Sequence, residues 1–331
     1  MYARWGLTVP LTGVPLAAHA PLLAELADVG YTDVWSSEVA GTDAFTPLAL
    51  ASTWAPTLRL GTAIAPVFTR GPGLLAMTAA TLAEAAPDRF RLGIGASSPV
   101  VVQDWNAQPF VDPFGRTRDT LRFLRKALAG EMVDEEYPTF RVRRFKLERP
   151  PASPPPILLA ALRAGMLRLA AAEADGVILN WLAASDLPKV RAELGGAKAG
   201  FETVARIFVC PTADEGYARE LGRRMIAGYL TVPAYAAFHR WLGRGPALEP
   251  MWQAWAAGDR RAATAAIPDE VVDALILHGT PQECRDKVGE YVRQGVQTPV
   301  IALLPTPELT TGGLSALRTT LFDLAPTVTE A

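Results

Sequence analysis

The chain has 331 residues, of which half are hydrophobic and a fifth are charged, so a large buried core is available. Its formal net charge of −2 argues against a nucleic-acid partner or an anionic membrane, because neither would meet a basic field. Cys210 and Cys284 are too few and too far apart for a disulfide framework or a metal cluster.

No segment of the sequence predicts insertion into a membrane. The stretch 1–10 lacks the apolar core of a secretory signal. Arg163 and Arg168 interrupt the best candidate for a spanning helix, residues 157–174. We therefore expect a soluble, cytoplasmic protein.

Short apolar runs alternate with amphipathic helical stretches through the first part of the chain. The expected strands and helices follow one another at 5–9, 16–30, 32–37, 46–56, 58–67, 73–87 and 89–95, beginning and ending with a strand. The strands are too apolar for one face to meet water, which is typical of parallel strands buried on both faces. This order predicts an α/β fold.

The same rhythm returns in the second half. Strands are expected at 155–161, 175–181, 204–210 and 298–305, with a helix at 166–174. Thr280 as N-cap, Pro281 in the first turn and Glu283 three residues after the cap predict a further helix. The total of eight strands is the number that closes a (β/α)8 TIM barrel, typically about 250 residues long.

The excess length falls in two insertions, near 97–155 and 215–266. The Arg- and Lys-rich part of the first could form a small hairpin, and its Pro-rich end is typical of a rigid connector. The second is Trp- and Ala-rich and helical. No domain boundary is visible, so we expect residues 1–331 to form a single domain.

The stretch "RFRLGIGASSP" contains Gly93 and Gly95 in a pattern that suggests a dinucleotide-binding turn. The third glycine of that fingerprint is missing, and the motif follows the fourth strand instead of the first. At the carboxyl end of a barrel strand, the same glycines would let a flat ring approach the backbone. We favour the barrel interpretation.

Several motifs, in order, resemble the luciferase-like monooxygenase superfamily and in particular its F420-dependent oxidoreductases. They are "GYTDVWSSE", "LGTAIAPVFTRGP", "RFRLGIGAS", "ILLAALRAGMLRLAAAEADGVILNW" and "GTPQECRDKVGEYVRQGV". The resemblance implies a TIM barrel, usually a homodimer, that binds the deazaflavin F420 or FMN at the carboxyl ends of its strands.

The resemblance also implies the positions that contact the cofactor. They are Ala63, Ile64, Gly95, Ala96, Ser97, Ala161, Leu162, Arg163, Ala164, Gly165, Met166, Asn180 and Trp181. In the family a cis peptide behind the ring corresponds to the Ala63–Ile64 bond, which could equally be an ordinary strand bond. The turn from Ala161 to Met166 would bind a phosphate with backbone N–H groups.

Alternatives remain at three of these positions and at the neighbouring Ser98. Arg163 stands where relatives often have glycine, and it either adds a cation for the cofactor or is an inert surface residue. Trp181 either contacts the cofactor or packs at the rim. Ser97 and Ser98 either hydrogen-bond the ring or cap the local backbone.

Glu38, at the end of the second strand, is the candidate catalytic residue, because a carboxylate at the barrel mouth can exchange protons with a substrate. The alternative is a salt bridge or a helix cap. Asp43 is expected to cap a turn or helix. His19, His239 and His278 have no spaced ligand partner, so surface or capping roles are expected and no metal site.

The sugar-phosphate dehydrogenases of the family carry an Asp-His pair and a second carboxylate where this chain has Glu38-Val39 and Ser98. We therefore expect hydride transfer between F420 and an unsaturated or carbonyl-type small molecule, in a pocket suggested by Trp35, Phe45, Val67 and Phe68. One alternative is an FMN-dependent monooxygenase with a partner flavin reductase. Another is a non-catalytic binding barrel.

Overall fold

The computed structural model describes residues 4–326. Within that part of the chain, eight parallel strands form the wall of a barrel, and the pairing of β9 with β10 closes the ring. In ring order the strands are β1 (Gly6–Thr8), β2 (Asp33–Ser36), β3 (Arg59–Thr62), β5 (Phe90–Gly95), β8 (Ile157–Ala160), β9 (Gly176–Asn180), β10 (Glu202–Cys210) and β12 (Thr298–Leu303). The expected TIM barrel is confirmed: each strand overlaps its predicted stretch, and β10 begins two residues before the predicted 204–210.

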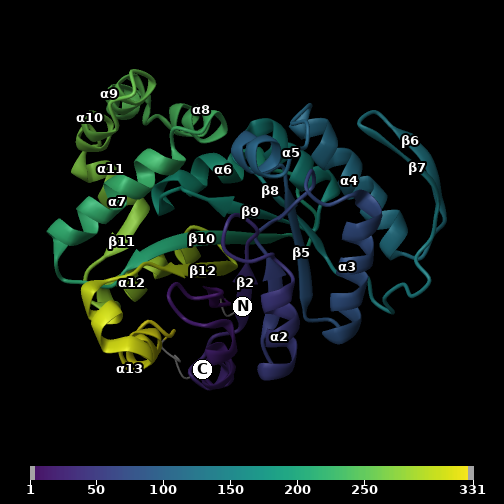
Figure 1. The fold of residues 1–331 in the computed structure, drawn as a ribbon, viewed down its shortest axis with the longest axis horizontal. Helices are drawn as coiled ribbons and strands as arrows, with labels where there is room; N and C mark the ends of the chain where they lie inside the picture. Colours follow the sequence, from purple (N-terminus) through teal and green to yellow (C-terminus); the bar gives the residue numbers. More distant parts are fainter. Residues whose placement is uncertain (1–3, 327–331) are drawn as a thin grey trace.

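Helices surround the barrel (Figure 1). Those between the strands are α1 (His19–Asp28), α2 (Thr46–Trp54), α3 (Pro72–Ala85), α5 (Ala164–Glu173), α6 (Leu187–Glu193), α12 (Pro281–Arg293) and the C-terminal α13 (Pro307–Asp323). Their starts follow local chemistry: the Asp43 carboxylate accepts from the backbone N–H groups of Phe45 and Thr46, and Thr280 and Glu283 form the predicted capping box. In residues 4–326, no helix is long and apolar enough to cross a membrane.

The third strand is shorter than predicted. It ends at Thr62, and the chain resumes pairing with β5 only at β4 (Ala65–Pro66). The Ala63–Ile64 peptide bond between them is cis, as the resemblance implied. The wall therefore bulges at the carboxyl end of β3.

The two predicted insertions leave the barrel on different sides. The first contains a π-helical turn (Val100–Trp105), α4 (Pro113–Leu128) and an antiparallel hairpin of β6 (Val133–Tyr137) and β7 (Phe140–Phe145). The second contains α7 (Glu215–Tyr229), α8 (Pro233–Leu242), α9 (Gly245–Ala256), α10 (Arg260–Ala265) and α11 (Asp269–Leu275). Figure 1 shows the hairpin and the helical insertion at opposite edges of the molecule.

One strand was not predicted. The short strand β11 (Ile276–His278) follows α11 and pairs with the last part of β10, from Phe208 to Cys210. The first part of β10 pairs with β9 up to Arg206. One long strand thus belongs both to the barrel wall and to the attachment of the helical insertion.

The middle of the barrel interior is filled by apolar side chains. Trp35 crosses it and packs with Leu158, Ile178, Val204 and Val300. Gly61 makes this possible, because a Cβ there would lie 2.2 Å from a Trp35 ring atom. The barrel is therefore a packed core at this level and not a pore.

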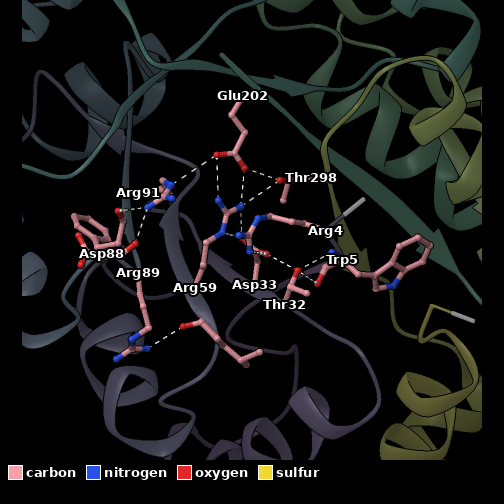
Figure 2. A network of polar contacts seen from close by, with 12 residues as sticks. Arg4, Trp5, Thr32, Asp33, Arg59, Asp88, Arg89, Arg91, Glu202 and Thr298 are labelled. Carbon is pink, nitrogen blue, oxygen red and sulfur yellow. Dashed lines mark hydrogen bonds and ion pairs between the residues drawn. The ribbon is translucent and has the colours of Figure 1, made fainter. Parts of the chain in front are cut away.

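Charged side chains close the amino-terminal end of the barrel (Figure 2). Arg59 donates to the Asp33 carboxylate at 2.6 Å and to the Glu202 carboxylate at 2.6 Å, and Thr298 donates to Glu202 at 2.6 Å. Each buried charge in this cluster meets an opposite charge, as burial requires. Polar groups at this end of a TIM barrel serve stability.

Candidate active site

Partly exposed side chains lie at the carboxyl ends of the barrel strands. Trp35, Ile178 and Val204 in the middle layer are fully buried. The next inward-facing residues toward the carboxyl ends of the barrel strands are partly exposed. They are Thr8, Ala63, Ala160, Asn180 and Arg206. Because catalytic groups of TIM barrels lie at this end, we place the candidate site here and call it the mouth.

Small residues form one side of the mouth. A Cβ on Gly95 would lie 2.9 Å from the Cβ of Ala160 and 3.3 Å from a side-chain carbon of Ile64, so only glycine fits there without displacement. Ala63 and Ile64 are partly exposed at the bulge, and Ala96 is partly exposed directly after β5. This side of the mouth presents backbone and methyl groups, a surface that suits the face of a flat ring.

The expected phosphate turn forms the start of a helix. Ala161 and Leu162 follow β8, Arg163 has an extended backbone as N-cap, and α5 begins at Ala164. No side chain caps this end of α5, so no side chain accepts a hydrogen bond from its first backbone N–H groups, which include those of Gly165 and Met166. Such a helix start is able to bind an anion, and the Arg163 side chain is exposed beside it.

Asn180 and Trp181 follow one another but differ in environment. The Asn180 amide donates to the Tyr235 hydroxyl at 3.0 Å, while its carbonyl oxygen is buried without a partner in the described chain. Trp181 is 1% exposed and lies against Phe208 and Tyr229, with ring centroids 4.2 and 5.0 Å away. Its packing matches the rim interpretation, and a cofactor contact stays a prediction.

The serines after β5 lie in the turn that leads to the first insertion. Ser97 has a left-handed backbone with φ of 65° and is partly exposed. The Ser98 hydroxyl accepts from the Val101 N–H at 3.4 Å, which is the local capping alternative. Whether Ser97 contacts a cofactor stays a prediction.

Glu38 is held by an ion pair. Its carboxylate accepts from the Arg70 guanidinium at 2.7 Å and from the Ala44 N–H at 3.2 Å. Both side chains of the pair are less than a fifth exposed, and Arg70 also lies over the Phe45 ring. These contacts match the salt-bridge and capping alternative, and the catalytic role of Glu38 stays a prediction.

The aromatic pocket expected from the sequence was largely wrong. Trp35, Phe45 and Val67 are buried in the core, at 5% exposure or less, and cannot line an open pocket. Phe68 is partly exposed and packs against Phe110. Apolar side chains at strand ends serve the core as readily as a ligand, and sequence does not separate the two uses.

All three histidines are buried, so the surface alternative was wrong for each of them. His19 is buried and its Nε2 accepts from the Leu11 N–H at 2.9 Å. His239 is buried in the helical insertion, and burial lowers its pKa to about 3. His278 lies 2.9 Å from the Asp273 carboxylate. Among residues 4–326, no cluster of three or more His, Cys, Asp or Glu side chains could hold a metal ion.

Arg206 is the mouth residue that the sequence analysis missed. It lies in the register position beside Asn180, on the neighbouring strand, and its guanidinium is 4.7 Å from the Phe208 ring centroid. The available signal was an arginine in the otherwise apolar strand "VARIFVC". An ionised side chain inside such a strand needs a partner, which makes Arg206 a candidate site residue.

A cleft of about 520 Å³ lies at the other end of the barrel. Charged residues from several strands and loops line it, including Arg91, Arg125, Asp175, Lys198 and Glu202. They form ion pairs with one another, such as Lys198 with Asp175 at 2.5 Å and Arg125 with Asp175 at 3.1 Å. Because its charges are already paired, we do not assign the active site to this cleft.

The fold and the open mouth define an enzyme-type TIM barrel. Residues 6–298 match the family described as luciferase-like monooxygenase. The chain therefore belongs to the luciferase-like monooxygenase family, as its motifs predicted.

Individual relatives agree with this assignment. A protein of Mycobacterium tuberculosis, provisionally named a coenzyme F420-dependent oxidoreductase, is 28% identical, with 90% of this chain and 92% of the relative covered. The structure of the coenzyme F420-dependent tetrahydromethanopterin reductase of Methanopyrus kandleri has a TM-score of 0.77 at 20% identity, with 98% of each chain covered. An FMN complex of a type II Baeyer-Villiger monooxygenase from Pseudomonas putida has a TM-score of 0.64 at 16% identity, with 99% of this chain and 98% of that one covered.

Proposed function

We propose that this protein is an F420-dependent oxidoreductase that transfers a hydride between the deazaflavin and an unsaturated or carbonyl-type small molecule. The observation that carries the proposal is the small-residue side of the mouth, where a Cβ on Gly95 would meet Ala160 and Ile64. Glycine at position 95 lets Ala160 and Ile64 lie close to the β5 backbone, so this side of the mouth can face a flat ring. The similarity to F420-dependent relatives supports the choice of cofactor.

The residues at the mouth fit such a cofactor in two respects. Ala63, Gly95 and Ala160 present little side-chain bulk, and the uncapped start of α5 offers backbone N–H groups for a phosphate. When bound, F420 accepts or supplies the hydride. The chain's share is to hold ring and substrate in contact and to exclude water.

The site residues have the following proposed roles. Ala63, Ile64, Gly95, Ala96 and Ser97 would line the ring; Ala161, Leu162, Arg163, Ala164, Gly165 and Met166 would hold the phosphate; Asn180 and Trp181 would border the ring; and Glu38 would hold or release a proton. We further propose that the chain forms a single domain and, like many members of its family, a homodimer.

The cofactor is tested by titrating the purified protein with F420 and, separately, with FMN, while following fluorescence. Saturable binding of F420, and reduction of enones or carbonyl compounds by reduced F420, would support the proposal. Binding of FMN without any response to F420 would overturn it in favour of a monooxygenase supplied by a flavin reductase, the activity class of the FMN-binding neighbour.

The substitution Ala160→Leu tests where the deazaflavin ring binds. In Ala160→Leu the longer side chain lies in the place assigned to the ring, so we expect a clash with the bound cofactor of about 1–3 kcal/mol, the size typical of overpacking. We expect the F420 dissociation constant to rise roughly 5- to 150-fold. Ala172→Leu, at an exposed position of α5, is the matched control. Equal F420 affinity in the two variants would contradict this placement of the ring.

A further inference from the structure

Arg206 is a largely enclosed cation for which the described chain supplies no anion. It lies in the barrel wall between Val204, which belongs to the packed interior, and Phe208, which lies against Trp181. Its Nε is buried and has no hydrogen-bond partner in residues 4–326. Within the same range, no carboxylate lies within ion-pair distance of its guanidinium.

Two other enclosed arginines, Arg59 and Arg244, are paired with carboxylates. Arg59, at the opposite end of the barrel, meets both Asp33 and Glu202 at 2.6 Å. Arg244, in the helical insertion, meets the Asp186 carboxylate at 2.9 Å. Arg206 is different because it lies at the mouth, where a ligand can reach it.

Two tyrosines of the helical insertion act on Arg206. Tyr229 and Tyr235, from α7 and α8, are the ionisable side chains that act on it, and burial raises the pKa of Tyr235, so this phenol stays protonated. Burial lowers the pKa of Arg206 itself, since its charge has lost water without gaining a counter-ion. A bound anion would relieve that penalty.

Asn180 lies beside Arg206 and contacts the Tyr235 hydroxyl. The two residues are register partners on adjacent parallel strands and both follow inward positions, Ile178 and Val204. The Asn180 amide nitrogen donates to the Tyr235 hydroxyl, which leaves that hydroxyl's proton free to bind an acceptor. A guanidinium and a phenol proton thus face the same part of the mouth.

We propose that Arg206, with the Tyr235 hydroxyl, binds an oxyanion of the substrate, so that the substrate is an anionic small molecule with a carboxylate or phosphate group. The assignment of the anion to a substrate rests on the proposed oxidoreductase function. A guanidinium binds two oxygens of such a group through parallel N–H donors. The cofactor phosphate has its own expected place at α5, which follows β8, two strands away in the ring.

The first experiment uses F420-free protein in chloride-free buffer, with benzoate and inorganic phosphate as probes in calorimetric titrations. We compare the natural chain with Arg206→Gln, Arg206→Lys, Tyr235→Phe and the surface control Arg168→Gln. Loss of charge-assisted hydrogen bonds should weaken binding of at least one probe about 10- to 100-fold in Arg206→Gln, and less in the other two site variants. The control should bind like the natural chain.

Folding is checked by circular dichroism. Because an unpaired charge is removed, Arg206→Gln should melt at or above the temperature of the natural chain. If it does not fold, Arg206→Lys and Tyr235→Phe decide the question. Equal affinity for both probes in the natural chain and in every folded site variant would overturn the proposal.

The second experiment separates substrate from cofactor as the source of the anion. An F420 dissociation constant unchanged by Arg206→Gln, together with weakened probe binding, supports a substrate anion. A large loss of F420 affinity in Arg206→Gln assigns the arginine to the acidic tail or phosphate of the cofactor and overturns the proposal. If the natural chain binds no F420, the proposed function fails, while the probe titrations still report on Arg206.

Discussion

Glu38 is the residue whose role is decided by a single substitution. If it exchanges a proton with the substrate, Glu38→Gln should lower kcat about 10²- to 10⁴-fold and leave F420 affinity unchanged. If it only holds Arg70, turnover should persist and the melting temperature should fall. The measurements are steady-state kinetics, F420 titration and thermal unfolding.

Arg70→Gln is the matched control, because it breaks the same ion pair from the other side. Similar kinetics in the two variants would return Glu38 to a purely structural role. A large loss of kcat in Glu38→Gln alone would establish that the carboxylate, and not the ion pair, is needed for the reaction.

For single residues, the sequence predicted those contacts that join residues close together in the chain. Asp43 caps its helix as expected because the groups involved are two and three residues apart. The pairing of Glu38 with Arg70 and the position of Arg206 beside Asn180 join residues from different strands and loops. No local pattern encodes such contacts, so the candidate site could be located only in outline.

At the scale of single elements, the strands of the barrel wall were predictable because each is an apolar run bounded by turn or helix signals. Two features were not. The strand β11 has three residues, too few to show a period, and it exists because β10 offers it a partner. The break between β3 and β4 depends on a backbone geometry that composition does not reveal.

The start of α12 allows a quantitative test of one element. The Thr280 side chain accepts from the Glu283 N–H, and the Glu283 carboxylate accepts from the Thr280 N–H at 2.8 Å. Thr280→Ala should lower the free energy of unfolding by about 0.5–2 kcal/mol, measured by urea denaturation. Thr81→Ala, in the middle of α3, should cost less, since alanine favours a helix interior. A smaller loss at Thr280 than at Thr81 would refute this role of the cap.

For the molecule as a whole, the charged cluster at the amino-terminal end of the barrel joins distant parts of the chain. Burial raises the pKa of Glu202, but hydrogen bonds and charge from Arg59 and a hydrogen bond from Thr298 outweigh it and hold the pKa below its usual range. A carboxyl whose pKa is lowered by folding stabilises the protein above its unfolded-state pKa. That contribution is lost as the pH falls through the folded-state value.

Glu202→Gln should therefore destabilise the protein at pH 7, and the difference from the natural chain should shrink as the pH falls below about 4. Unfolding by urea at several pH values measures this. Glu84→Gln, an exposed partner of Arg149, is the control and should change the free energy of unfolding by about 1 kcal/mol or less. A stability difference that stays constant with pH would show that Glu202 contributes by packing and not by charge.

The double use of β10 has a mechanical consequence. Since its backbone pairs with β9 and β12 in the wall and continues directly into pairing with β11, the helical insertion is fastened by a hydrogen-bond ladder at the point where it meets the barrel. The insertion is thus joined to the barrel wall by strand pairing and not by a loop alone. Tyr229 and Tyr235, which this insertion supplies from α7 and α8, therefore have their place beside Arg206 set by the same strand that carries the arginine.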